Sequence, residues 1–147
     1  MPGKCDGQVV IVTGAGRGLG RAHALALASE GAFVLVNDLG VSRDGESTEF
    51  SPADQVVSEI LEMGGKAEAN SADVADWEQA EKMISHAVEK WGRLDALICN
   101  AGFLRDRMLV GMSEEEWDSV IRVHLKGHFA PARHAAGRGS SDQQGTC

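Results

Sequence analysis

The sequence contains no tyrosine among its 147 residues, so it offers no phenol as an acid or a base. Cysteine is scarce: Cys5, Cys99 and Cys147 are odd in number and far apart, which argues against a disulfide framework and against a zinc site. This cysteine usage indicates a reducing compartment, and we expect the cytoplasm. The net charge of −8 argues against nucleic acid or an anionic membrane as the main partner, since both favour basic patches.

Long apolar runs are missing as well. No stretch approaches the roughly 20 apolar residues of a membrane-spanning helix, and the N-terminal MPGKCDGQVV lacks the basic and apolar regions of a secretory signal. What the sequence does have is 43% hydrophobic residues and 18 glycines. This composition is typical of one globular domain with its own core.

Short apolar runs alternate with segments of helical periodicity. The predicted strands are QVVIVTG (8–14), AFVLVND (32–38), KAEANSADV (66–74) and LDALICNAG (94–102). The predicted helices are 18–31, 53–65, 76–92 and 112–136, with a polar loop at 39–52. Asp76 with Gln79, and Ser113 with Glu116, resemble capping boxes, and Pro131 would kink the last helix. Strands that alternate with helices predict an α/β fold with a doubly wound parallel sheet.

The first predicted strand passes into a helix through the glycine-rich turn TGAGRGLG, from Thr13 to Gly20. Such a turn aims backbone N–H groups at one point, where the helix N-terminus adds partial positive charge, and together they bind a pyrophosphate. Gly14 would make the tight turn, Gly18 would let the ligand approach the backbone, and Gly20 would let helix and strand pack closely. The alternative is a turn whose glycines serve packing alone.

Asp38 ends the second predicted strand, where a carboxylate can accept hydrogen bonds from an adenosine ribose and would repel a 2'-phosphate. This favours NAD over NADP, although Arg17 in the glycine turn offers a cation to that phosphate. A surface aspartate at a strand end is the alternative.

The ends of the third and fourth predicted strands supply further candidates. Asp73 could reach the exocyclic amine of an adenine and Val74 could cover its ring, but a plain strand-end turn explains these residues equally well. Asn100, Ala101 and Gly102 would let the nicotinamide side of a cofactor lie against the backbone. A structural turn in the central sheet is the alternative there, and both roles can hold at once.

In this order, TGxxxGxG, Asp38, Asp73-Val74 and Asn100-Ala101-Gly102 resemble the short-chain dehydrogenase/reductase family, from about Gly7 to Ala136. VNDLG, GVSRDGESTEFSPADQVV, LRDRML and SVIRVHLKGHF resemble more specifically the (3R)-hydroxyacyl-CoA dehydrogenase region of peroxisomal multifunctional enzyme type 2 and its bacterial relatives. The resemblance implies NAD-dependent oxidation of a 3-hydroxyacyl-CoA or a similar secondary alcohol, in fatty acid metabolism. It adds Leu19 to the cofactor-binding residues, and implies a homodimer or tetramer and, in a eukaryote, the peroxisome as another location.

The resemblance also shows what this sequence lacks. The family's reaction uses a tyrosine as general acid and base, a lysine four residues later that lowers the pKa of that tyrosine, and a serine that holds the substrate oxygen. A sequence without tyrosine has no such motif. His124 stands where the wider family often has an asparagine that supports a proton relay, so we expect a supporting catalytic role there. The alternative is a helix residue that contacts the sheet edge.

The sequence pattern changes once, after Ala136, where polar residues and glycines follow. We therefore expect an NAD-binding Rossmann-type domain at 1–136, incomplete on its C-terminal side, with strand order 3-2-1-4, and a disordered or aberrant tail at 137–147. The strand LDALIC would lie at the sheet edge, and the helix at 112–136 would expose part of its apolar face. Three functions stay open: the family's oxidoreductase activity, a noncatalytic nucleotide-binding fragment, and a truncated product without function.

Overall fold

The computed structural model describes residues 2–40 and 51–142. Its first elements are β1 (Val9–Val12), α1 (Gly18–Ser29), β2 (Phe33–Asn37), α2 (Pro52–Glu62), β3 (Lys66–Asn70), α3 (Trp77–Trp91) and β4 (Ala96–Ile98). After them come the 3-10 turn η1 (Leu109–Gly111), α4 (Glu114–Ile121), the π-helical η2 (Arg122–Lys126) and α5 (Gly127–Asp142). Most of the predicted polar loop at 39–52 lies outside the described residues.

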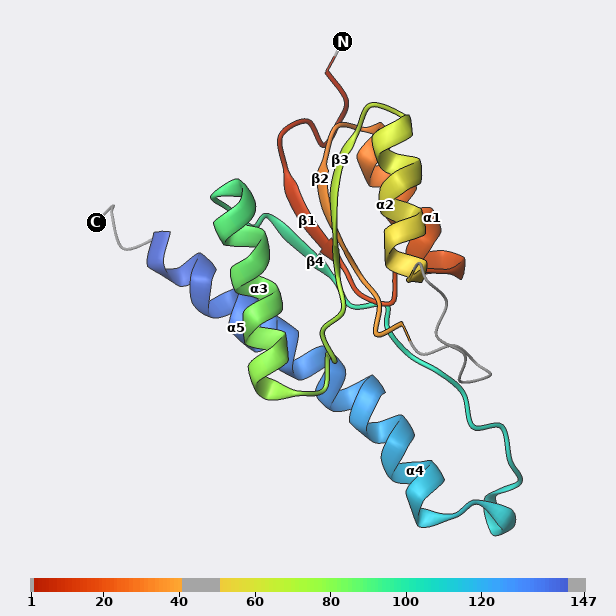
Figure 1. The fold of residues 1–147 in the computed structure, drawn as a ribbon. Helices are drawn as coiled ribbons and strands as arrows, with labels where there is room; N and C mark the ends of the chain where they lie inside the picture. The colour runs from red at the N-terminus through yellow and green to blue at the C-terminus, as the bar shows by residue number, and fades with distance from the viewer. Residues whose placement is uncertain (1, 41–50, 143–147) are drawn as a thin grey trace.

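The described strands form one parallel sheet in the order β3-β2-β1-β4, which confirms the predicted Rossmann-type fold and its strand order. Helices α1 and α2 cover one face, α3 and α5 cover the other, and α4 extends away from the sheet (Figure 1). β4 lies at the edge of the described sheet, as predicted. Because all strands are parallel, their carboxyl ends meet at one edge, which is where such folds bind ligands.

Alternate residues of the central strands point to opposite faces, and each face has its own core. One core lies under α1 and α2 and includes Val10, Val12, Val34, Val36, Ala24, Val56 and Ile60. The other lies under α3 and includes Val9, Ile11, Leu35, Met83, Ile84 and Ala87. Burial on both faces explains why β1 and β2 are continuously apolar in sequence.

The two predicted capping boxes differ in the structure. Ser113 and Glu116 form a complete box at the start of α4. At the start of α3, Asp76 Oδ1 accepts from the Gln79 backbone N–H at 2.9 Å, but Gln79 Oε1 accepts from the Asp73 backbone N–H at 3.0 Å. The second half of that predicted box is therefore wrong, because Gln79 ties the helix to the turn that precedes it.

The helix predicted at 112–136 is not one regular helix. α4 passes into α5 through η2, where the Gly127 N–H bonds to the Arg122 carbonyl in π-helical geometry. The irregularity precedes Pro131, which lies inside α5. Close packing accompanies this turn, since a Cβ at Gly127 would lie 2.9 Å from Val74 Cγ2.

Ala136 does not end the helix, because α5 continues to Asp142. Arg138 Nη2 donates to Ser85 Oγ of α3 at 2.7 Å, so this extension is tied to the rest of the fold. The helix therefore runs six residues beyond its predicted end. The disordered or aberrant tail expected at 137–147 stays a prediction, and 143–147 lie outside the described residues.

Part of the apolar face of α4, η2 and α5 is exposed, as the sequence predicts, whereas Ala130 of α5 is buried. The side chains of Trp117, Leu125 and Phe129 are 55%, 65% and 57% exposed. Among the described residues, no helix is both long and apolar enough to cross a membrane.

Candidate nucleotide-binding site

Hydrogen bonds around Thr13 hold the glycine turn against the segment that follows β4. Thr13 is fully buried, and its Oγ1 accepts from the backbone N–H groups of Asn100 at 3.0 Å and Ala101 at 3.1 Å. In return, Asn100 Nδ2 donates to the carbonyl oxygens of Thr13 at 3.2 Å and Gly14 at 3.1 Å. Asn100 therefore has the structural role in the central sheet that the sequence left as one alternative.

The glycines of the turn meet different surroundings. Gly14 has a φ of +62°, and a Cβ there would lie 2.7 Å from Ala101 Cα. A Cβ at Gly20 would lie 2.3 Å from the Gly14 carbonyl oxygen, so the close packing expected at Gly20 is present. Gly18 has a φ of +55° and no described heavy atom within 4 Å of its ideal Cβ. The turn is thus packed at both ends and open at Gly18.

Helix α1 begins at this opening without a side-chain cap. Arg17 is its N-cap and makes no capping hydrogen bond through its side chain. The first N–H groups of an α-helix have no partner within the helix and carry partial positive charge. Leu19, in the first turn, is 73% exposed. The start of α1 therefore offers backbone donors to an anion.

Asp38 is fixed beside the same turn. Its Oδ2 accepts from the Gly16 N–H at 3.1 Å and its Oδ1 from the Gly40 N–H at 2.9 Å. A Cβ at Gly16 would lie 2.7 Å from the Asp38 carboxylate and 2.5 Å from Pro52 Cβ. Gly16 was not among the residues predicted from the sequence, although it is the second glycine of the TGAG turn.

Asp73 is ion-paired with a residue far along the chain. Its Oδ2 accepts from Arg122 Nη2 at 2.8 Å, and its Oδ1 accepts from the Ala75 N–H at 2.9 Å. Burial raises the pKa of Asp73, but these two hydrogen bonds outweigh it and hold that pKa below its ordinary value. The carboxylate is therefore ionised at neutral pH. Val74 is only 6% exposed and packs in the core next to α3.

A cleft of about 520 Å³ lies at the carboxyl ends of the strands. The predicted residues that line it are Gly14, Asp38, Asp73, Val74, Ala101 and Gly102. The lining residues that were not predicted are Asn37, Leu39, Ala72, Phe103, Arg105 and Val123. The other predicted residues, Arg17, Gly18, Leu19, Gly20 and Asn100, do not line it but belong to the glycine turn or hold it. Among the described residues, no cluster of His, Cys, Asp or Glu suits a metal ion.

His124 lies outside this cleft. Its Nε2 is 3.0 Å from the backbone nitrogen and 2.8 Å from the carbonyl oxygen of Phe103, and a Cβ at Gly102 would lie 2.4 Å from its ring. It therefore contacts the chain that leaves the sheet edge, which was the alternative to a catalytic role. That role stays a prediction.

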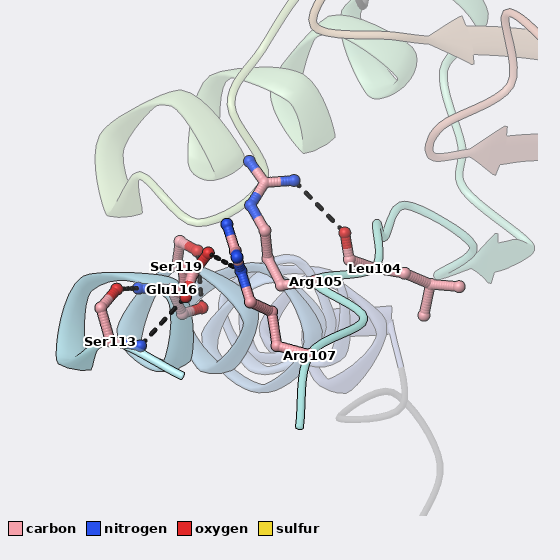
Figure 2. Close-up of polar contacts among 6 residues, drawn as sticks. All are labelled: Leu104, Arg105, Arg107, Ser113, Glu116 and Ser119. Carbon is pink, nitrogen blue, oxygen red and sulfur yellow. Dashed lines mark hydrogen bonds and ion pairs between the residues drawn. The ribbon is translucent and has the colours of Figure 1, made fainter. Parts of the chain in front are cut away.

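Another cavity, of about 390 Å³, adjoins the cleft on the side of His124. Phe103 and Arg105 line both, with the Arg105 guanidinium 4.6 Å from the centre of the Phe103 ring. Figure 2 shows how the segment between β4 and α4 is attached: Arg107 Nε donates to Glu116 Oε1 at 2.7 Å. This ion pair joins the segment between β4 and α4 to the first turn of α4.

A family model for short chain dehydrogenases matches residues 8–146. Peroxisomal multifunctional enzyme type 2 of Mus musculus is 51% identical over 134 residues, which are 91% of this chain and 18% of that protein. A hydroxyacyl-CoA dehydrogenase of Mycobacterium tuberculosis is 45% identical over 131 residues, 89% of this chain and 40% of that protein. A solved short chain dehydrogenase from Mycobacterium avium is 58% identical with a TM-score of 0.88, over 97% of this chain and 50% of that one. This chain thus spans half or less of the length of these relatives.

Proposed function

This chain belongs to the short-chain dehydrogenase family, and we propose that it forms the NAD-binding part of an oxidoreductase. Members of this family act on small molecules with a nicotinamide dinucleotide, NAD or NADP. The observation that supports the proposal best is the cleft at the strand ends, where the Asp38 carboxylate is bonded to the glycine turn. The bound cofactor would accept a hydride from the substrate, and the residues described below would bind and orient it.

The described residues fit such a cofactor. The open backbone at Gly18 and the uncapped start of α1, with Arg17 and Leu19 beside them, would receive the pyrophosphate. Asp38 would accept hydrogen bonds from the adenosine ribose, while Asp73 and Val74 would border the adenine. Ala101 and Gly102, small residues that line the cleft, would admit the nicotinamide side.

NAD is the preferred cofactor in this proposal. A 2'-phosphate next to Asp38 would place two anions together in a partly buried cleft, where like charges repel more strongly than in water. Arg17 favours NADP instead, because it offers a nearby cation to the 2'-phosphate. We assign the preference to Asp38 because it is anchored by two backbone N–H groups.

For the complete enzyme we propose oxidation of a 3-hydroxyacyl-CoA or a similar secondary alcohol, in the cytoplasm or the peroxisome and as a homodimer or tetramer. The mycobacterial relative is named for hydroxyacyl-CoA oxidation, and the mouse relative for the peroxisome. This sequence has no tyrosine that could exchange a proton with the alcohol. We therefore propose that these 147 residues alone bind the nucleotide without turnover.

Isothermal titration of the chain with NAD and NADP tests the proposal. We expect NAD to bind at least about tenfold more tightly than NADP, and Asp38→Ala to remove most of that difference. Gly18→Asp should abolish binding, because it places a carboxylate where the pyrophosphate would lie. Gly64→Asp is the matched control: Gly64 also has a positive φ, +80°, with nothing described within 4 Å of its ideal Cβ, and it precedes β3 at the opposite end of the sheet.

Two results would contradict the proposal. If the wild-type chain gives no heat with millimolar NAD, or if Gly18→Asp binds NAD as well as Gly64→Asp does, the cleft is not a nucleotide site. If the chain produces NADH from NAD and a 3-hydroxyacyl-CoA above background, the assignment of binding without turnover is wrong.

A further inference from the structure

A chain of side-chain hydrogen bonds adjoins the part of the cleft that Ala72, Asp73 and Val74 line. Asn37 and Asn70 end β2 and β3 and are neighbours in the sheet register. Asn37 is 1% exposed, and its Nδ2 donates to Asn70 Oδ1 and to the Ala72 carbonyl oxygen, both at 3.0 Å. Asn70 Oδ1 also accepts from the Ala72 N–H at 3.0 Å.

Asn70 therefore holds two parts of the cleft at once. Its backbone carbonyl accepts from the Asp38 N–H at 3.0 Å, and its side-chain oxygen fixes Ala72, the residue before Asp73. Both Asp38 and Ala72 line the cleft. The orientation of the Asn70 amide thus sets the position of the turn at 72–74 relative to Asp38.

The other side of this amide meets His86 of α3. Asn70 Nδ2 lies 3.1 Å from His86 Nδ1, and His86 Nε2 lies 3.2 Å from Glu68 Oε1. Because two N–H donors occupy Asn70 Oδ1, the amide nitrogen faces His86 and can only donate. His86 Nδ1 must then be an acceptor, so the ring is neutral and carries its proton on Nε2, toward Glu68.

We propose that Asn70 is a positioning residue of the nucleotide site and that protonation of His86 weakens nucleotide binding by displacing the Asn70 amide. A proton on Nδ1 would bring two donors to within 3.1 Å of each other. Either the amide turns and loses its bonds from Ala72 and Asn37, or the His86 ring moves away and leaves the amide without its acceptor. The proposal rests on the nucleotide binding proposed above.

The charged groups around His86 come from three elements. Glu68 of β3 contacts the ring and also pairs with Lys90 of α3 at 2.8 Å. Lys82 and Glu89 of α3 are exposed on neighbouring turns, and Arg138 of α5 bonds to the adjacent Ser85.

Two carboxylates near the turn, Glu68 and Asp73, have pKa values below their ordinary values. The hydrogen bond from Lys90 and, to a lesser degree, that from His86 hold the pKa of Glu68 below its ordinary value despite burial. The pKa of Asp73 is also held low.

The test is NAD affinity at about pH 8 and about pH 5.5, a range that spans the ordinary titration of an imidazole. We expect about three- to tenfold weaker binding at the lower pH, the effect of one or two lost hydrogen bonds. His86→Asn should remove this pH dependence, since its side-chain oxygen stands in the place of Nδ1 and takes no proton. His134→Asn, at a histidine whose ring contacts the Trp77 carbonyl at 3.1 Å, should retain it. An unchanged pH dependence in His86→Asn overturns the proposal.

A second variant should reverse the direction in which NAD affinity changes with pH. In Asn70→Asp, the carboxylate still accepts from Ala72 and Asn37 but also accepts from a protonated His86, so NAD affinity should rise as the pH falls. A merely structural role for Asn70 would instead weaken binding equally at both pH values.

The hydrogen-bond network also has a readout that needs no nucleotide. In 15N NMR spectra of the free chain, the Ala72 N–H and the Asn70 side-chain amide should titrate together with the His86 ring, and should stop doing so in His86→Asn. If the chemical shift of the Ala72 N–H stays constant while that of the His86 ring changes with pH, the proposal is overturned even if NAD binds. A chain that binds no NAD at either pH overturns the proposed function, and the Ala72 resonance then still decides whether His86 governs the amide.

Discussion

Replacing Thr13 by valine tests how the two halves of the site are held together. Valine keeps the shape of threonine but removes the hydroxyl that accepts from the backbone N–H groups of Asn100 and Ala101. Thr13 is fully buried, so water cannot easily take the place of the hydroxyl. An unsatisfied buried donor costs about 1–3 kcal/mol. Because Asn100 and Ala101 are themselves only half-buried, we expect the low part of that range for each, or about 2–4 kcal/mol together.

That loss is a large part of the roughly 5–15 kcal/mol that stabilises a typical domain. Urea unfolding followed by the fluorescence of the three tryptophans measures it. Thr13→Ser is the control: it keeps the hydroxyl and removes one buried methyl group, which costs about 0.5–1.5 kcal/mol. If Thr13→Val is no less stable than Thr13→Ser, the hydroxyl does not hold the segment after β4 and the reasoning is refuted.

Two further predictions concern α4 and η2. Burial raises the pKa of Asp73, but chiefly its hydrogen bond from Arg122 holds that pKa below the ordinary value of 3.8. The ion pair therefore stabilises the fold above about pH 4, and this stabilisation is lost as the pH falls through the pKa of Asp73 in the folded chain. Arg122→Gln should therefore lower the free energy of unfolding at about pH 6 more than at about pH 3, and an equal loss at both would contradict this. Ser113→Ala should cost about 1 kcal/mol by removing the α4 cap. Ser119→Ala, which removes only a hydroxyl that donates to the Glu116 carbonyl within the helix, should cost less than about 0.5 kcal/mol in the same thermal unfolding assay, and equal costs would speak against the cap.

The sequence predicted the sheet and the central part of the site because both follow from local pattern and parallel topology. Val9–Val12 is continuously apolar, as a strand buried on both faces must be. Once the strands are parallel, residues that end different strands, such as Asp38 and Ala101, must meet at one edge. Their positions in the chain were therefore enough to bring them into one cleft.

The missed features depend on contacts between distant residues. Arg122 reaches Asp73 across 49 positions of the chain, and no spacing rule in either segment marks the pair. The role of Asn70 could not be predicted from the sequence for the same reason, since its amide is oriented by Asn37 of the neighbouring strand and by His86 of a helix. The helix end predicted at Ala136 has a related cause. The loss of apolar residues in the sequence suggests an end there, whereas α5 continues to Asp142 with its Arg138 bonded to α3.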